Sequence, residues 1–277
     1  MTDLEAAQAR VSKWRKNEGG IWRERIVMLA ANAREKRLHV GSNVVLPKAV
    51  RDRIRAEAGV DVEFTKVHVR FHQGAGDALV RPLVGGTQIQ STEAEMLGTL
   101  GLVVQSVIGD IGLLTAGHFV GAPGDAIGQP DDDNANLVAT VVANNFIAPG
   151  TVDGAFAIIN SNTQFQVGGV WQPGGAPALV LDNLINVPDE DSPCTMQGAD
   201  TGTSAGQVVY NNVEIGNLTN VALATYAAQE GDSGGPVFNG TSFLGVHSLA
   251  VDNPSGGTLS GFTQVSGLLQ VVNFNLG

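Results

Sequence analysis

From residue 82 onward, the chain consists of short apolar segments separated by residues that favour turns. Glycine, proline, asparagine and aspartate stand between the segments, a pattern typical of strands joined by turns. Cys194 is the only cysteine, so no intrachain disulfide can form and the apolar cores must hold the fold together. This part of the sequence therefore predicts a mainly β structure. Its clearest strands are expected at residues 102–104, 137–142, 178–181 and 207–210.

Basic residues are confined to the start of the chain. All 16 Lys and Arg residues lie at or before Arg81, so residues 1–81 carry a formal charge of +6 and residues 82–277 carry −17. We divide the sequence accordingly into a basic N-terminal segment, residues 1–80, and an acidic domain, residues 81–277. Two interpretations stay open: the acidic charge keeps the domain soluble, or it attracts the basic segment, which docks and regulates it. Neither part has the basic patch that nucleic acid binding requires, so no nucleic acid partner is expected.

The N-terminal segment is predicted to be mainly helical. Apolar residues recur at helical spacing over residues 3–17 and again over residues 21–30. A third helix is expected over residues 47–58, because it begins at a proline and Gly59 would stop it. A strand over residues 62–69 then leads toward the acidic domain. The pattern fits a propeptide, a partner-binding arm or an oligomerisation element, and does not choose among them.

The sequence shows no targeting segment. Its first 30 residues mix charges of both signs and contain no apolar run of secretory length. No stretch approaches the ~20 apolar residues of a membrane span. We therefore expect a cytoplasmic protein with no membrane partner.

Residues 231–236 read Gly-Asp-Ser-Gly-Gly-Pro and predict a reactive serine, Ser233. A serine hydroxyl is a weak nucleophile at neutral pH, so it needs a base within hydrogen-bond reach and donors for the oxyanion it creates. Gly231 can adopt backbone angles closed to other residues, which lets the N–H groups of Gly231 and Ser233 converge on one point. We expect these two groups to form an oxyanion hole. On its own, the hexapeptide also fits a glycine-rich hairpin turn.

His118 is the candidate base. It follows a short apolar run, at a point where a strand gives way to a loop, and imidazole has the pKa that base and then acid chemistry near neutral pH requires. His39, His68 and His72 fall in the polar N-terminal segment and are expected at the surface. His247 is the remaining alternative.

Asp153 is the candidate third group, which would hold the imidazole in the correct tautomer and stabilise its cation. It is the one carboxylate in the otherwise apolar segment 151–159. Asp125 and the acidic run 131–133 lie nearer to His118, but among Gly, Pro and Asn, so solvated loops are expected there. A cation site in 131–133 stays open, although its spacing matches no EF-hand pattern. No metal is expected in the active site.

In the order His118, Asp153, Ser233, the chain resembles the trypsin-like serine peptidases of the chymotrypsin fold. The resemblance covers residues 82–277 and implies a double six-stranded antiparallel β-barrel, preceded here by the helical segment. It implies a serine endopeptidase that cleaves protein or peptide substrates through an acyl-enzyme and needs no cofactor. An esterase with the same three residues, or a protein-binding module with an idle site, is the alternative. The matching elements are residues 115–118, 152–155, 231–236 and 244–248.

A narrower resemblance points to the narrow-leaf type of trypsin-like proteins and their bacterial intracellular relatives. It rests on residues 81–87, 98–101 and 198–203. Those relatives carry an extra N-terminal segment and no secretion signal. This chain departs from their pattern at Ala199-Asp200, where Arg-Thr is usual.

Substrate specificity is predicted from the family resemblance. Ala227, six residues before the nucleophile, would lie at the base of the S1 pocket, so no carboxylate is present there to pair with Lys or Arg. Ser248, Ala250 and Ser260 would complete the pocket. These residues favour a small or moderately apolar P1 side chain.

An acidic P1 side chain is the alternative. His247 resembles, by its position, the histidine of glutamate-selective members of the fold, whose ring meets the substrate carboxylate. Glu230 would lie near the same entrance and repel an anion.

Asp232 raises the question of how the site becomes active. In zymogen-activated members of the family, a new N-terminus pairs with the aspartate before the serine, which is Asp232 here. Residues 83–86 resemble such a start, but Pro82 makes cleavage after Arg81 unfavourable. We therefore expect either an oxyanion hole that forms without cleavage or an activating protein partner that acts through the N-terminal helices.

Overall fold

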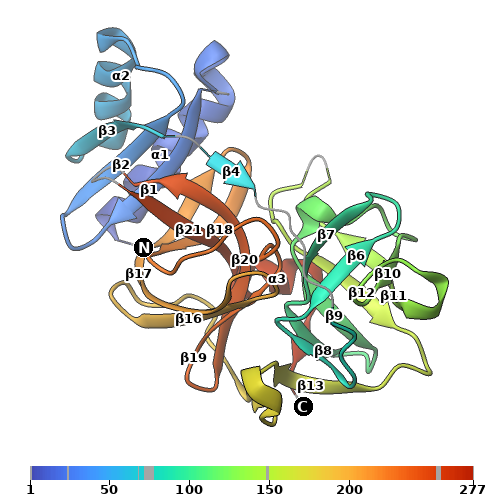
Figure 1. Ribbon diagram of the computed structural model, residues 1–277. Coiled ribbons are helices and arrows are strands. Elements are labelled where there is room, and N and C mark those ends of the chain that lie inside the picture. Colours follow the sequence, from blue (N-terminus) through green and yellow to red (C-terminus); the bar gives the residue numbers. More distant parts are fainter. Residues whose placement is uncertain are drawn as a thin grey trace.

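The computed structural model describes residues 2–23, 25–67, 69–71, 78–147, 150–253 and 257–276. Two large β-sheets form the body of the molecule, and an N-terminal lobe adjoins the second of them (Figure 1). The mainly β prediction is confirmed. None of the described helices is long and apolar enough to cross a membrane.

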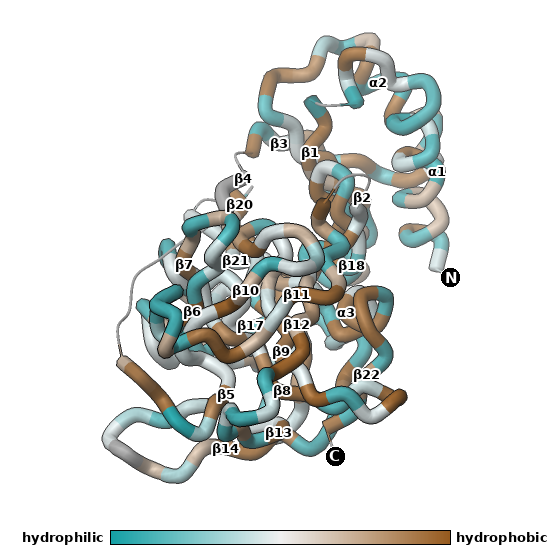
Figure 2. Tube along the Cα trace, turned by 90° about the vertical axis from the view of Figure 1, so that its right-hand side faces the viewer, coloured by the Kyte–Doolittle hydropathy of each residue, from teal (hydrophilic) through white to brown (hydrophobic). Residues whose placement is uncertain are grey.

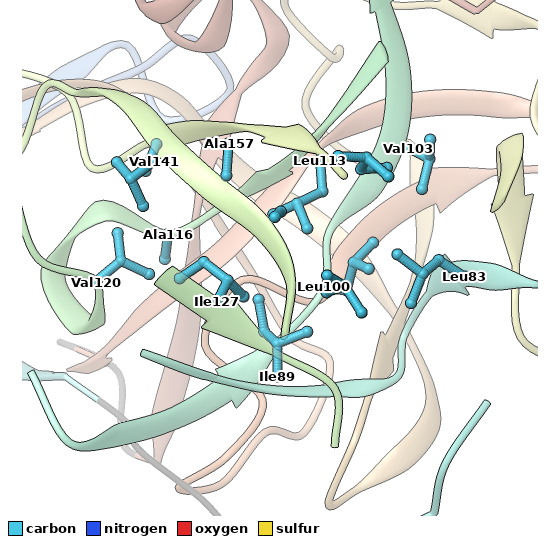
Figure 3. Packing of buried hydrophobic residues seen from close by; sticks show 14 of the residues in the cluster. Leu83, Ile89, Leu100, Val103, Leu113, Ala116, Val120, Ile127, Val141 and Ala157 are labelled. Atoms are coloured by element: carbon cyan, nitrogen blue, oxygen red, sulfur yellow. The ribbon is translucent and has the colours of Figure 1, made fainter. Parts of the chain in front are cut away.

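The first sheet is formed by the earlier half of the acidic domain and by one strand from its end. Eight strands of the described chain follow the order β22-β8-β9-β12-β11-β10-β6-β7, and neighbouring strands run antiparallel. Apolar side chains, among them Leu113, Ile127 and Val141, fill its core (Figure 3). The strands are β6 (Gln88–Ser91), β7 (Met96–Thr99), β8 (Leu102–Ser106), β9 (Ile111–Thr115), β10 (Ala126–Gly128), β11 (Leu137–Asn144), β12 (Ala155–Ile159) and β22 (Phe274–Asn275).

The second sheet is formed by the later half and continues into the N-terminal lobe. Its main path is β16-β19-β20-β21-β18-β17-β1-β2-β3, and two further strands, β4 and β15, pair with β20. The strands are β1 (Ile26–Asn32), β2 (Arg37–Ser42), β3 (Val62–Lys66), β4 (Val69–Phe71), β15 (Asn183–Leu184), β16 (Pro193–Gly198), β17 (Gly202–Ile215), β18 (Leu218–Ala224), β19 (Pro236–Asn239), β20 (Ser242–Asp252) and β21 (Thr258–Gln264).

Smaller elements complete the body of the molecule. A three-stranded sheet joins β5 (Leu83–Gly85), β13 (Phe165–Val170) and β14 (Leu179–Val180). Helix α3 (Val265–Val271) follows β21 and contacts strands of both large sheets. Each large sheet holds more strands than the six expected for a barrel, in part because β22 joins the first sheet and the lobe strands extend the second.

The N-terminal lobe, residues 2–67 as described, mixes helices and strands. Helices α1 (Asp3–Glu18) and α2 (Lys48–Ala58) confirm two predicted helices, and Gly59 ends α2 with a φ of 64°. Their apolar side chains pack against those of β1, β2 and β3. Figure 2 shows the two helices beside these strands. The lobe is therefore not mainly helical.

The helix expected over residues 21–30 is wrong. A short 3-10 turn, η1 (Gly20–Arg23), precedes strand β1 in this region. A short apolar run fits a buried helix and a buried strand equally, so its spacing does not separate them. Strand β1 is buried because it lies between β2 and β17.

The basic N-terminal segment docks on the acidic domain. Strand β1 pairs antiparallel with β17, with Met28 opposite Ile215 and Leu29 opposite Glu214. Arg15 on α1 is 1% exposed and forms an ion pair with Glu214. These contacts show that the segment docks on the acidic domain, whereas attraction by the opposite net charges and regulation by the segment stay predictions.

Replacing Arg15 by methionine is expected to destabilise the docked lobe by about 3 kcal/mol, because the mutation leaves Glu214 as a buried carboxylate without its main partner. Lys16 lies 3.2 Å from the same carboxylate but is 38% exposed, so Lys16→Met is the matched control with a small expected effect. Urea unfolding of both variants checks this expectation. Equal loss of stability in the two variants would contradict the role given to Arg15.

Candidate active site

The loop that carries Ser233 has a backbone that only its glycines can adopt. Gly231 and Gly234 have φ angles of 108° and 92°, in the region that favours glycine. A Cβ on Gly234 would lie 2.2 Å from both the Thr115 hydroxyl and the Thr99 carbonyl oxygen. Ser233 itself is buried. The hexapeptide is therefore a tightly packed loop between the two sheets rather than an exposed hairpin turn.

Thr99, at the end of β7, holds this loop against the first sheet. Its backbone N–H donates to the Ser233 carbonyl at 2.7 Å, and its hydroxyl donates to the Gly231 carbonyl at 2.5 Å. The Thr115 hydroxyl donates in turn to the Thr99 carbonyl at 2.8 Å, three residues before His118. Thr99 is a positioning residue that the sequence did not reveal.

Replacing Thr99 by valine is expected to slow covalent labelling of Ser233 by a fluorophosphonate about tenfold to hundredfold, because the loop loses a bond that fixes it. Thr99→Ser keeps the hydroxyl and should restore most of the rate. The labelling rate and the extent of labelling are measured together, so a misfolded fraction is separated from a slower site. Equal rates for the valine and serine variants would contradict this role of the hydroxyl.

His118 lies directly after β9, in the short turn η2 (Gly117–Phe119), and contacts Asp153 twice. Its ring Nδ1 lies 2.7 Å from Oδ2 of Asp153, and its backbone N–H donates to Oδ1 at 2.9 Å. The ring stands edge-on between Phe119 and Phe146, with centroid separations of 6.0 and 5.9 Å. Because an ionised carboxylate only accepts hydrogen bonds, Nδ1 carries the proton that faces Asp153.

Asp153 is fully buried just before β12 and is surrounded by donors. The Ser248 hydroxyl donates to Oδ2, and the Thr263 hydroxyl donates to the Asp153 carbonyl at 2.7 Å. Burial raises the pKa of Asp153, but the charge and hydrogen bonds of His118 and the Ser248 bond outweigh it, so the pKa lies below its ordinary value. Asp153 is therefore held as a carboxylate.

Strand β20 connects Asp153 to the serine loop. The Gly234 N–H donates to the His247 carbonyl at 2.7 Å, and the next residue, Ser248, bonds to Asp153. The structure thus brings His118, Asp153 and the Ser233 loop to one place. Ser248 was predicted as a pocket residue and its contact with the carboxylate was missed, because a serine in an apolar strand gives no local signal of its partner.

Asp232, next to the serine, is buried and held by backbone groups. Its Oδ1 accepts from the N–H groups of Asp200 and Thr201 at 3.1 and 2.9 Å, and its Oδ2 accepts from that of Gln229 at 2.8 Å. A Cβ on Gly198 would lie 2.0 Å from Oδ1, so this glycine makes room for the carboxylate. Burial, and then the charge of Asp232, raise the pKa of Asp200.

The segment that resembles an activated N-terminus lies inside the uncut chain. Leu83 is buried, and its N–H donates to the Gln164 carbonyl at 2.8 Å. Among the described residues, Asp232 is bonded by amides and by no N-terminal ammonium group. The carboxylate that a new N-terminus would bind is thus already held.

A family model described as Trypsin matches residues 83–272. The chain belongs to the trypsin family. Solved structures share this fold: Thermobifida fusca protease A is 22% identical with a TM-score of 0.56, covering 70% of this chain and 98% of that one. Cellulomonas bogoriensis chymotrypsin is 21% identical with a TM-score of 0.56, covering 70% and 97%. A glutamic acid specific serine protease that utilises a histidine triad in substrate binding is 19% identical with a TM-score of 0.58, covering 70% and 100%.

Trypsin family membership confirms the chymotrypsin-like fold class. It also supports a peptidase of the hydrolase class that acts on peptide or protein substrates. A search of curated proteins gave no match. The narrower resemblance to the narrow-leaf type stays a prediction.

The residues predicted for the S1 pocket gather around the strand pair β20 and β21. Ala250 lies opposite Ser260 in this pair, and the Ser260 hydroxyl donates to the Tyr226 carbonyl at 2.7 Å. Ala227 follows Tyr226 and is exposed, as is Glu230. The structure thus brings Ala227, Ala250 and Ser260 together, while the location of substrate side chains stays a prediction.

His247 is fully buried and has an aromatic partner that the sequence did not reveal. The Tyr226 hydroxyl lies 3.0 Å from Nδ1 of His247, and the two rings meet edge-on. Burial raises the pKa of Tyr226 well above its ordinary value, so the phenol keeps its proton. His247 lies on β20 beside the serine loop, whereas His118 is the histidine that contacts Asp153.

Asp125, predicted in a solvated loop, is buried. Asp125 accepts hydrogen bonds from the Ser91 hydroxyl at 2.6 Å and from the backbone N–H groups of Glu93 and Gly121, both at 2.8 Å. It fixes the loop between β9 and β10 instead of facing solvent, because three donors satisfy its carboxylate.

The acidic run 131–133 does not form a close group of metal-ligating atoms among the described residues.

His39 is also buried rather than exposed, because β2 lies between β1 and β3. Its Nε2 lies 2.9 Å from Oε2 of Glu35, and its Nδ1 lies 3.7 Å from Oε2 of Glu63. Arg37 contacts both carboxylates, at 3.8 and 3.3 Å, so its positive charge offsets part of their negative charge within the lobe. His68 and His72 lie outside the described residues.

Proposed function

We propose that this chain is a serine endopeptidase in which Ser233 attacks the peptide carbonyl, His118 acts as general base and Asp153 orients His118. The observation that carries the proposal is the buried pair of His118 and Asp153, with Nδ1 and Oδ2 2.7 Å apart, next to the glycine-shaped serine loop. Such a pair on its own is a common structural motif. Combined with a serine loop of the trypsin family, it supports acyl transfer.

The chemistry follows from the tautomer that Asp153 selects. Because Nδ1 of His118 donates to Asp153, Nε2 is left as the basic atom. In the proposed reaction, the Ser233 oxygen bonds to the substrate carbonyl carbon, and its proton passes to Nε2 and then to the leaving amine as the C–N bond breaks. Water repeats the sequence on the acyl-enzyme. The N–H groups of Gly231 and Ser233 would stabilise the oxyanion formed in each half.

The amide contacts of Asp232 support an oxyanion hole that forms in the uncut chain. In the proposed scheme, the N–H groups of Asp200, Thr201 and Gln229 replace the cation that a new N-terminus would bring. Amide donors stabilise a buried carboxylate without proteolytic activation. The N-terminal segment is then free for another kind of regulation, of which an activating protein partner is one form.

For specificity we favour a small or moderately apolar P1 side chain, since Ala227 and Ala250 supply no charge. An acidic P1 side chain is the second candidate, favoured by His247 on β20 and by the similarity in fold to a glutamic acid specific protease. The exposed Glu230 argues against it.

Fluorophosphonate labelling followed by peptide mapping tests the nucleophile. The proposal expects one labelled residue, Ser233, and no label on Ser233→Ala. A panel of matched peptide and ester substrates then separates an endopeptidase from an esterase, because only the endopeptidase cleaves internal peptide bonds. A protein that is labelled nowhere and cleaves neither class would be a binding module with an idle site.

A further inference from the structure

Strand β20 runs past the reactive serine and has one edge that the barrel does not use. On one side β21 pairs with it as far as Asp252, and on the other side β19 pairs with it only as far as Val246. Residues 249–251 therefore lie beyond the last partner on the β19 side. They follow directly after Ser248, which bonds to Asp153. A peptide that binds beside the nucleophile would add a strand at such an edge.

The chain itself fills this edge. Strand β4 pairs antiparallel with β20, with Val69 opposite Val251, Arg70 opposite Ala250 and Phe71 opposite Leu249. In Figure 1, β4 lies beside β20 between the N-terminal lobe and the first sheet. Its direction brings the chain from Val69 toward the end of the edge that is nearest to Ser248. This is the direction in which the acyl side of a substrate would approach Ser233.

We propose that residues 69–71 occupy the acyl side of the protein's own substrate groove, so that the intact chain is latent toward extended peptides. The inference rests on the proposed peptidase function, because it needs a substrate that pairs with β20. The inhibitor is the chain's own backbone. Main-chain pairing of this kind does not depend on side-chain identity, so a strand of almost any sequence would compete with substrate.

The docked lobe keeps β4 in place. Val67, two residues before β4, is buried, and its N–H donates to the Ser42 carbonyl at 2.9 Å. The lobe in turn is fixed to β17 by β1 and by the ion pair between Arg15 and Glu214. A strand tethered this closely has an effective concentration on the order of millimolar, and its competition does not weaken when the protein is diluted.

Two successive proline substitutions in β4 test the proposal in the full-length chain. In an antiparallel strand, the backbone N–H of every second residue points toward a given neighbouring strand. Because proline has no N–H, replacing both Arg70 and Phe71 by proline removes at least one hydrogen-bond donor toward β20. If β4 covers the edge nine-tenths of the time, this double variant should hydrolyse extended peptides about tenfold faster than the parent. The ratio of the two hydrolysis rates, variant to parent, should be the same at every protein concentration.

The matched control is Arg70→Val with Phe71→Val, which changes the same side chains but keeps both N–H groups. It is expected to stay as latent as the parent chain. Intact mass spectrometry of every preparation ensures that uncut proteins are compared. Fluorophosphonate labelling of the proline variant checks that its Ser233 site is folded.

The outcomes separate the inference from the function on which it rests. Equal peptide hydrolysis by the parent and the labelled proline variant would overturn the inference and leave the peptidase proposal intact. Equal activation by the valine variant would also overturn it, since side chains rather than the backbone ladder would then hold the strand. If no variant is labelled or cleaves peptide, the proposed function itself fails.

Discussion

Replacing Ser233 by alanine is expected to lower kcat for peptide hydrolysis by a factor on the order of 10⁵ to 10⁶, because the acyl-enzyme cannot form without the hydroxyl. The buried serine loop should keep its shape, since Thr99 and His247 bind its backbone rather than the hydroxyl. KM and the unfolding midpoint should therefore change little. The measurement is steady-state hydrolysis of a peptide substrate. Ser233→Ala is made in the Arg70→Pro/Phe71→Pro variant, so that a groove covered by β4 does not mask the loss of activity.

Ser192→Ala is the matched control for this substitution. Its hydroxyl donates to the Asp189 carbonyl in an exposed turn. The control should retain the full rate. Retention of more than about 1% of the rate by Ser233→Ala, after contaminating peptidases are excluded, would mean that another residue is the nucleophile.

Replacing Asp153 by asparagine is expected to lower kcat by about 10⁴-fold, because the isosteric amide turns an N–H₂ group toward donors and removes the charge. The carboxylate now accepts from the His118 ring, the His118 backbone and the Ser248 hydroxyl. An amide cannot accept all three bonds, so the His118 tautomer that leaves Nε2 basic is no longer favoured. Hydrolysis measured with Asp153→Asn and with Asp125→Asn checks the effect.

Asp125→Asn is the matched control because Asp125 is also buried and accepts three hydrogen bonds, but does not contact His118. It should reduce stability and leave kcat nearly unchanged. If both asparagine variants lose activity to the same extent, general destabilisation and not orientation of His118 would explain the loss.

The same aspartate gives a pH dependence of stability. Because the pKa of Asp153 is lowered in the folded chain, its stabilising contribution is complete above the ordinary pKa of about 4 and is lost as the pH falls through the lower folded value. The stability difference between the parent and Asp153→Asn should therefore be largest near neutral pH and shrink below pH 4. Urea unfolding across this range measures the difference.

Local sequence patterns pointed to His118, Asp153 and the Ser233 loop, which the structure brings together. Gly231 has a φ angle closed to most other residues, as expected, and Asp153 stands where a carboxylate interrupts an apolar segment. His118 follows strand β9 as expected. In each of these positions, a short stretch of chain determines the backbone and the burial of one side chain.

The features that sequence reasoning missed all depend on contacts between distant segments. Strand β1 was mistaken for a helix because its burial comes from β2 and β17, and β17 lies far along the chain. The pairing of β4 with β20 joins residues about 180 positions apart, and hydropathy does not reveal strand partners. Asp125 was expected in solvent because two of its three donors, Ser91 and Glu93, lie more than 30 positions earlier in the chain.

Digestion of a proteome-derived peptide library tests whether Ser233 is the nucleophile of an endopeptidase. The parent chain, the Arg70→Pro/Phe71→Pro chain and the same chain with Ser233→Ala are compared by mass spectrometry of the products. We predict new internal cleavages with the proline variant, fewer with the parent and none with the Ser233→Ala chain. The residues before each cut report the P1 preference. Internal cleavage by the Ser233→Ala chain, or none by a fluorophosphonate-labelled proline variant, would contradict the proposed function.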